Sequence, residues 1–360
     1  MAWKVAWRVL VDGQDATDGM RPHLISVTVT DKDGTASDTC SLEFDDSGGQ
    51  ISLPRDGAKV QVYLDGVLVF SGTVDSVRSS GTRGGGRTLS VGAKGFDAKG
   101  KTKEPQSHHM DDATLQQFLD EAAAKAGLSG IQIDPAFANI KRDYWSADAE
   151  SFLHIGQTLA RELNATFKIR DDKAVLAQRG QGTSAVGGAM PTVVGIVGQN
   201  VISWSIAPIT SRRKFAKTSV RYFDRASASF KSMVVETGIV GADAVNEVRS
   251  AAADEDQARA IGEGRKTEGE REGGEGSVEL NLAVEAQAEG TFILSGARPG
   301  VDGTYRIVSV VKKADRGGGS TTLLELKQPG GGAGADDRPA EANITQTDEG
   351  FALPAHETLG

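Results

Sequence analysis

The chain contains the same glycine-tipped hairpin pattern twice. An alternating apolar strand leads to a turn closing on Arg-Gly-Gly-Gly, at residues 83–86 and again at 316–319, and a Thr-rich strand follows each time. Consecutive glycines permit the positive φ values of a tight reversal, and Val, Ile and Thr favour a pleated surface. Two unrelated hairpins could share this turn chemistry, but a Ser-Val step at equal distance before each Arg-Gly-Gly-Gly favours duplication. We therefore expect two related β domains.

The composition agrees with a chain of many short strands. The 360 residues are enough for two or three domains, and 45 glycines with only 6% aromatic residues indicate many turns. The net charge is −9, and the stretch 328–360 contributes −5 of it, from six acids and one base. An acidic chain without a basic stripe argues against a protein that binds nucleic acid through its phosphates.

Cysteine content and hydropathy bear on the compartment. The single cysteine, Cys40, has no partner for an internal disulfide and lies in an apolar strand pattern, so we expect an inert buried thiol and a reduced compartment. The first eight residues place Lys4 and Arg8 where a signal peptide has an apolar run, and no segment has the length of a membrane span. The sequence predicts a cytoplasmic protein without a cleavable signal or membrane insertion.

Turn signals and periodicity divide the chain. Alternating strands separated by Asp12-Gly13, Asp33-Gly34 and Asp65-Gly66 predict a barrel-like first β domain of six or seven strands. Alternation resumes at Val201 and continues through the second hairpin, with a polar run at 263–275 that we expect to stay solvated. The predicted organisation is mainly β: a first β-barrel at 1–104, an α+β insert at 105–180, a linker at 181–191, a second β-barrel at 192–327 and a disordered acidic tail at 328–360.

Three helices are expected between these strands. Asp111 and Asp112 can cap a first helix with an apolar stripe that ends at Gly127, and a second runs from about Ala147 to Leu163. The third is expected within the second β domain, from a Ser250 cap to about residue 264. The apolar stripes of the first two suit each other or the hairpin at 166–177, which completes the insert.

Three stretches resemble the phage late control gene D family, the central hub of contractile-tail baseplates, whose fold is similar to the N-terminal half of type VI secretion VgrG spikes. In order and spacing together they span residues 24–327. The matching segments are 27–31 with 37–39, 42–46, 53–54 and 57; 151–155 with 159–163, 166–169 and 179–180; and 296–303 with 308–310 and 321–324.

This resemblance implies a structural hub and its partners. Such hubs carry two related barrels per subunit, so a homotrimer presents six barrels and can join a six-fold tail tube to a three-fold spike. The expected partners are the tube protein, baseplate wedge components and a separate trimeric spike, since this chain has an acidic tail where VgrG chains continue into a spike. Assembly in the bacterial host cytoplasm, into a virion or tail-like particle, follows. Within the tail, Phe351 and Leu353 form the only apolar cluster and are the candidate spike contacts.

No catalytic, metal or cofactor site is expected. His108 and His109 beside the two acids at 111 and 112 hint at a metal, but adjacent residues rarely converge on one ion. Asp45-Asp46 more readily begins a turn than forms a carboxylate pair, and His154 lies one step off the apolar face of its helix.

Two functions of other classes remain open. Asp143 and Glu150, near Tyr144 and Trp145, could form a sugar-cleaving pair in a cell-wall-degrading tail enzyme, although the sequence provides no shaped cleft. A receptor- or carbohydrate-binding β module would need clustered exposed aromatic residues, and the 4 Trp and 4 Tyr are scattered.

Overall fold

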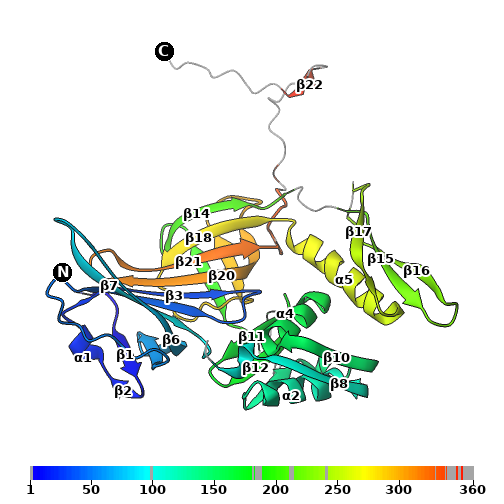
Figure 1. Ribbon diagram of the computed structural model, residues 1–360. Helices are drawn as coiled ribbons and strands as arrows, with labels where there is room; N and C mark the ends of the chain where they lie inside the picture. The colour runs from blue at the N-terminus through cyan, green and yellow to red at the C-terminus, as the bar shows by residue number, and fades with distance from the viewer. Residues whose placement is uncertain are drawn as a thin grey trace.

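The computed structural model describes residues 3–97, 100–180, 182, 189–210, 215–239, 242–328, 330–336, 338, 346–347 and 350–351. One long sheet forms the body of the protein, and two smaller bodies that contain the longer helices lie beside it (Figure 1). The expectation of a mainly β fold is confirmed.

The first barrel forms from strands with alternating burial. Cys40 packs with Leu42 and Phe44 in its core, while the residues between them face outward. The hairpin at Asp65-Gly66 has φ values of 47° and 80°, the left-handed pair that a two-residue type I′ turn requires. The elements are β1 (Trp7–Val11), β2 (Gln14–Asp15), α1 (Thr17–Met20), β3 (Leu24–Lys32), β4 (Thr39–Asp45), β5 (Lys59–Leu64), β6 (Val67–Thr82), β7 (Gly86–Lys94) and η1 (Lys101–Lys103).

The second barrel has its own core, in which Phe292 and Tyr305 are among the largest buried side chains. It is assembled from segments on both sides of an interruption at residues 208–274. Its strands are β13 (Thr192–Ile196), β14 (Val201–Ala207), β18 (Glu275–Asn281), β19 (Thr291–Ser295), β20 (Gly303–Asp315) and β21 (Gly319–Lys327).

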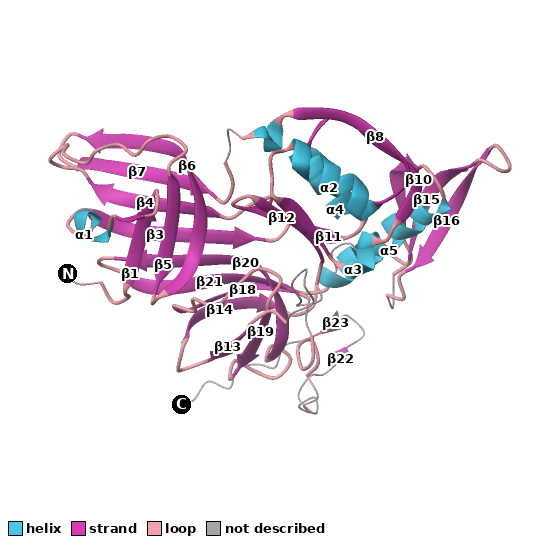
Figure 2. Cartoon of the chain, turned by 90° about the horizontal axis from the view of Figure 1, so that it is seen from below, coloured by secondary structure: helices cyan, strands magenta, loops and turns pink. Residues whose placement is uncertain are grey.

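The two barrels share one continuous sheet. Its main path runs β14-β18-β21-β20-β3-β4-β7-β6-β5-β1-β2, and the antiparallel pair β20 and β3 joins one barrel to the other. Figure 2 shows these strands as a stack, with β6 and β7 toward one end and β14 toward the other. The first eight strands of the path therefore form a band to which both barrels contribute.

The two glycine-tipped hairpins have the same register. Thr73 lies opposite Lys94 in the first hairpin, and Arg306 lies opposite Lys327 in the second. Adding 233 to a residue number of the first hairpin gives the equivalent residue of the second. Both hairpins carry a register shift at the same place, after Val74 in the first copy and after Ile307 in the second. The bulge occurs at the same residue in both hairpins, and a shared turn chemistry alone does not explain that coincidence.

The neighbouring strand pairs repeat as well. β4 pairs with β7 over seven residue pairs, and β18 pairs with β21 over the seven equivalent ones. β3 and β14 also correspond. The pairing of β3 with β4 and that of β14 with β18 each shift register after the first residue pair, and residue numbers differ by 177, as between Leu24 and Val201. The first strands differ, because β1 is antiparallel to β5 whereas β13 is parallel to β19. The prediction of two related barrels is thus confirmed.

The insert packs two helices against a three-stranded sheet and a two-stranded ribbon. Its core contains Phe118, Phe152 and Phe167, all at most 2% exposed. The elements are β8 (Pro105–Thr114), α2 (Leu115–Lys125), β9 (Gly130–Ile133), α3 (Pro135–Ala138), β10 (Lys141–Ser151), α4 (Phe152–Glu162), β11 (Ala165–Arg170) and β12 (Lys173–Gln178).

The predicted starts of the insert helices were wrong. Asp111 and Asp112 belong to strand β8, and Thr114 caps α2 through a capping box with Gln117. Residues 147–151 lie in β10, and Ser151 caps α4 by accepting a hydrogen bond from the backbone N–H of His154. In both cases a strand extends to the cap, because the ribbon of β8 and β10 covers the helices.

A third body interrupts the second barrel. It consists of β15 (Lys217–Asp224), β16 (Ser229–Glu236), β17 (Val245–Ala252) and α5 (Glu255–Arg271). The expected Ser250 cap was wrong, because Ser250 lies in β17 and Asp254 caps the helix. The polar run at 263–275 was also misassigned: it is helical as far as Arg271, whose side chain is only 6% exposed.

The start of the predicted tail is ordered on the second barrel. The backbone N–H of Gly330 donates to the Thr304 carbonyl at 2.6 Å, that of Gly334 donates to Gly300 at 2.8 Å, and Ala333 packs on the core. The prediction of a disordered tail from residue 328 was therefore wrong for residues 330–336. Farther on, the structure describes Arg338, β22 (Gln346–Thr347) and β23 (Gly350–Phe351). Within the described residues, no helix is both long and apolar enough to cross a bilayer.

Candidate functional site

Buried charges hold the three main bodies together. Asp33, from the turn after β3, forms ion pairs with Arg179 of the insert at 2.9 Å and with Arg271 of α5 at 3.1 Å. Glu289, which precedes β19, binds the same Arg271 at 3.2 Å and accepts a hydrogen bond from the backbone N–H of Gly180 at 2.6 Å. One guanidinium thus links the two barrels, and both acids are less than a tenth exposed.

A second cluster lies along the same junction. Lys168 of β11 contacts Asp31 and also Asp38, the latter at 2.8 Å, and Arg170 binds Asp38 at 3.1 Å. The backbone N–H of Ala288, in the second barrel, donates to the other oxygen of Asp31 at 2.9 Å. Because each buried charge has partners, the usual cost of burying it is offset by pairing and hydrogen bonding.

The pKa values follow from this arrangement. Burial and the neighbouring Asp33 carboxylate raise the pKa of Glu289 to about 7, although the Arg271 guanidinium lowers it. Burial also acts on Asp31, but Lys168 outweighs it and holds the pKa of Asp31 below its usual value. Burial and the charge of Asp31 raise the pKa of Asp38. Perturbed carboxyls often mark catalytic sites, but ion-pair networks perturb them in the same way.

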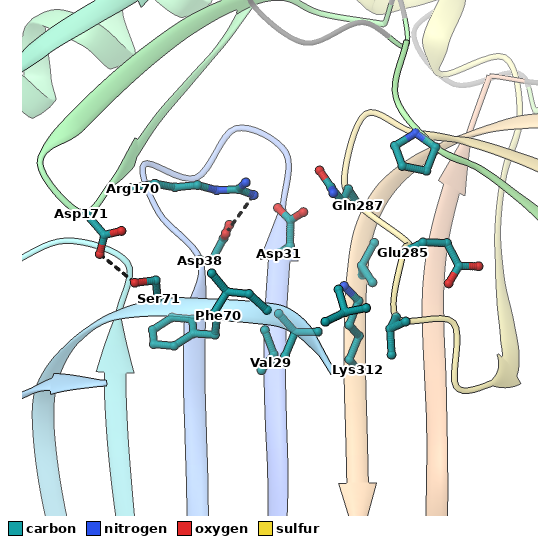
Figure 3. A pocket seen from close by; sticks show the side chains of 16 residues that line it. Val29, Asp31, Asp38, Phe70, Ser71, Arg170, Asp171, Glu285, Gln287 and Lys312 are labelled. Atoms are coloured by element: carbon teal, nitrogen blue, oxygen red, sulfur yellow. Dashed lines mark hydrogen bonds and ion pairs between the residues drawn. The ribbon is translucent and has the colours of Figure 1, made fainter. Parts of the chain in front are cut away.

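A cavity of about 350 Å³ opens beside the second cluster. Figure 3 shows Asp31, Asp38 and Lys312 rising from neighbouring strands, with Arg170 and Asp171 reaching in from the insert. Asp171 accepts a hydrogen bond from Ser71 of β6 at 2.9 Å. Burial lowers the pKa of the Lys312 ammonium, although the nearby acids raise it. The cavity is a seam between bodies and is lined by the residues that join them.

Backbone hydrogen bonds complete the attachment of the insert. The N–H of Ile169 donates to the Ala36 carbonyl at 2.7 Å, and that of Asp171 donates to Gly95 at 2.8 Å. The insert therefore contacts the first barrel through main chain as well as charge. The geometry suits a rigid scaffold whose parts keep a fixed relative position.

The histidine residues singled out from the sequence do not converge. His108 stacks on Phe118, and burial lowers its pKa, while His109 stacks on Tyr144. Across the described part of the chain, no group of three or more His, Cys, Asp or Glu could hold a metal ion. His154, farther along, forms an exposed pair with Glu150 at 3.4 Å.

The acidic candidates are equally dispersed. Asp45 accepts hydrogen bonds from Ser47, as a turn residue does, while Asp46 accepts one from the backbone N–H of Ile51. Asp143 lies on the exposed ribbon, 3.8 Å from Arg225. Cys40 is buried as expected, and burial raises the pKa of its thiol to about 12.

The candidate spike contacts lie at the limit of the structure. The backbone of Phe351 is in β23, and Leu353 lies outside the described residues. Their role stays a prediction.

Sequence reasoning missed the junction charges. Asp33 was interpreted only as a turn residue, Arg179 only as part of a family motif, and Arg271 as part of a solvated run. No local signal marked the two arginines, because Arg179 simply follows β12 and Arg271 ends α5, and their burial depends on acids from other parts of the chain.

Solved structures with the same fold are phage-tail and secretion proteins. A 43 kDa tail protein of prophage MuSo2 from Shewanella oneidensis has a TM-score of 0.69 at 14% identity, covering 90% of this chain and 98% of that one. A tail protein from Neisseria meningitidis has a TM-score of 0.64 at 15% identity, covering 90% and 96%. A type VI secretion component of E. coli, described as similar to T4 tail proteins gp27 and gp5, has 0.58 at 11%, covering 94% and 79%. The chain thus has the same fold as these phage-tail and type VI secretion proteins.

Curated relatives narrow the class. The chain is 28% identical over 192 residues to the probable baseplate hub protein of Escherichia phage P2, covering 52% of this chain and 49% of that one. It is 26% identical over 191 residues to the probable baseplate hub protein of phage 186, covering 52% and 48%. The chain spans about half the length of these relatives, and no protein-family model matches it. The resemblance to baseplate hub proteins stated from the sequence is confirmed.

Proposed function

We propose that this protein is a structural baseplate hub of a contractile tail or tail-like injection particle. In this proposal a homotrimer connects the six-fold tail tube to a three-fold spike that a separate trimeric protein supplies. Baseplate wedge components surround it, and assembly takes place in the bacterial host cytoplasm. The role is structural rather than catalytic.

One observation carries the proposal: a single chain contains the same strand ladder twice, with the same bulge at the same residue. Two equivalent barrels in each of three subunits make six equivalent barrels around an axis. In such a ring the six barrels match the symmetry of a six-fold tube, and the three chains match the symmetry of a three-fold spike. The buried ion pairs support it, because they fix one barrel against the other.

Native mass spectrometry of the purified full-length chain tests the proposal. Three copies of 37.7 kDa give an expected mass of about 113 kDa, and class averages in electron microscopy should show a ring of six similar lobes. A chain that stays monomeric at all accessible concentrations and forms no ring would contradict it.

A further inference from the structure

A buried lysine lies between two buried carboxyl groups where the insert meets the first barrel. The side-chain nitrogen of Lys168 contacts Oδ1 of Asp31 and lies 2.8 Å from Oδ1 of Asp38. Lys168 is 12% exposed, and each acid is 11% exposed. Lys168 belongs to β11, whereas Asp31 lies in β3 and Asp38 directly precedes β4. The fold thus brings an amine and two acids from distant parts of the chain into one contact.

Each acid has a second partner, and these partners differ. Oδ2 of Asp38 binds the guanidinium of Arg170 at 3.1 Å, as Figure 3 shows. Oδ2 of Asp31 accepts a hydrogen bond from the backbone N–H of Ala288 at 2.9 Å. The Arg170 cation polarises the Asp38 carboxyl group and can stabilise negative charge on its oxygen, as donors of an oxyanion hole do. Asp38 is therefore the acid more open to attack at its carboxyl carbon.

The three groups also differ in protonation. Burial and the charge of Asp31 raise the pKa of Asp38, which favours its uncharged acid form. Burial raises the pKa of Asp31, but the charge of Lys168 outweighs burial, so that the pKa is lowered and the carboxylate is favoured. Burial lowers the pKa of Lys168, but the two acids outweigh burial and raise it. The resting cluster is therefore an ammonium, a carboxylate that can accept its proton, and a polarised carboxylic acid.

We propose that Lys168 and Asp38 of the same chain join through an amide bond between their side chains, with Asp31 as the proton acceptor. Lys168 first transfers an ammonium proton to Asp31, and the free amine attacks the carboxyl carbon of Asp38. Asp31 then gives its proton to the departing hydroxyl group and takes the remaining proton that the new C–N bond releases. One C–N bond forms and one C–O bond breaks, and the products are an amide, one water molecule and protonated Asp31.

The site provides what this condensation needs. A general base must lie within hydrogen-bonding reach of the proton that it removes, and Asp31 contacts the Lys168 nitrogen. Both reacting side chains are held on strands, and well-oriented groups of this kind reach effective molarities of about 10⁵–10⁸ M. The cavity of about 350 Å³ beside the cluster has both acids in its lining and offers the released water an exit.

Burial also favours the product. A buried ion pair carries a desolvation penalty that its attraction only partly offsets. An amide is polar but uncharged, so its transfer from water costs much less than that of the separate ions. The bond would link positions 130 residues apart and fasten the insert to the first barrel covalently. It does not depend on the proposed trimer.

Mass spectrometry of the denatured full-length chain tests the proposal without any substitution. The chain should be lighter than its sequence by one water molecule. After trypsin, residues 162–170 should appear joined to residues 33–55, because trypsin does not cleave after a lysine whose amine is in an amide. Asp31 lies on a different tryptic peptide, since Lys32 separates it from Asp38. A chain of unreduced mass that is cleaved after Lys168 would overturn the proposal, and a bond to the peptide that ends at Lys32 would overturn the assigned roles.

Two variants test the roles of the groups. Lys168→Arg keeps the positive charge but removes the primary amine, so the loss of water should disappear. Asp31→Asn removes the proton acceptor and should slow bond formation by about a hundredfold, the low end of what general acid–base catalysis contributes. The time course of the water loss after refolding measures this rate. A bond that forms equally fast in Asp31→Asn would contradict the role of Asp31.

An exposed ion pair of the same length is the internal control. Lys94 lies 2.8 Å from Asp75, but the two side chains are 40% and 28% exposed. Solvent stabilises both ions there, so this pair should stay unbonded and trypsin should cleave after Lys94 in the same digest. An amide at both pairs would show that sample treatment, and not the buried cluster, produces the bond, and would overturn the proposal.

Discussion

The residues that decide how this chain is assembled are buried and charged. Arg271 donates to both Asp33 and Glu289, and each of the three side chains is less than a tenth exposed. A buried ion pair is weak evidence for stability as such, because desolvation opposes the attraction. Its value here is geometric, since a guanidinium in contact with two acids from different barrels allows only a narrow range of relative positions.

We predict that Arg271→Met destabilises the folded chain by about 3–5 kcal/mol, because it leaves two acids buried beside one fewer cation. Urea unfolding of the full chain, followed by circular dichroism, measures the change. Arg265→Met is the matched control on the same helix: Arg265 pairs with Glu268 at the surface and should cost no more than about 0.5 kcal/mol. Similar losses for both variants would show that the junction adds nothing beyond ordinary helix pairing.

Among the elements, helix α4 shows how close packing fixes the insert. Gly156 lies on its buried face, and a Cβ at this position would meet the Phe167 ring at 2.4–2.7 Å. Phe167 is itself 2% exposed and packs edge-on against Phe152. The helix therefore approaches β11 more closely than any side chain at 156 would allow.

We expect Gly156→Ala to destabilise the insert by about 1–3 kcal/mol, although alanine favours helix, because the ring of Phe167 must move in a filled core. Thermal unfolding of the variant and of Gly19→Ala checks this, since Gly19 of helix α1 has open space around the added methyl group. An unchanged melting temperature for Gly156→Ala would mean that α4 can shift without cost.

The errors in element assignment have a common origin. The Thr114 capping box with Gln117 was readable from the sequence, but two aspartates just before it are equally good caps in isolation. The helical run to Arg271 contains several glycines and alternating charges, which favour a solvated segment by composition. Pairing of β8 with β10, and the acids around Arg271, override these local preferences.

In the whole molecule, the acidic C-terminal segment is the candidate for contact with the spike. Residues 330–336 pack on the second barrel, so a candidate spike-binding segment has to begin beyond them. Phe351 and Leu353 remain its predicted contacts, with ordering entropy offset by apolar burial.

Deletion of residues 341–360 should therefore weaken binding of the spike protein at least tenfold while the native mass of the hub, corrected for the deletion, stays that of a trimer. Calorimetry or pull-down with the purified spike protein measures the first effect, and Phe351→Ser with Leu353→Ser in the full chain should reproduce most of it. Unchanged spike affinity after the deletion would remove the tail from the interface.

The sequence alone determined many of the barrel strands, their turns and their duplication, because alternation and glycine-tipped reversals are local and depend on few residues. It also indicated the baseplate-hub resemblance. Only the tertiary structure decided that β3 of one barrel pairs with β20 of the other, and that Asp33, Arg179, Arg271 and Glu289 meet at that seam. Arg271 and Glu289 are 18 residues apart, but Asp33 is 238 residues from Arg271, and the energies of these contacts depend on burial, which no local pattern of residues specifies.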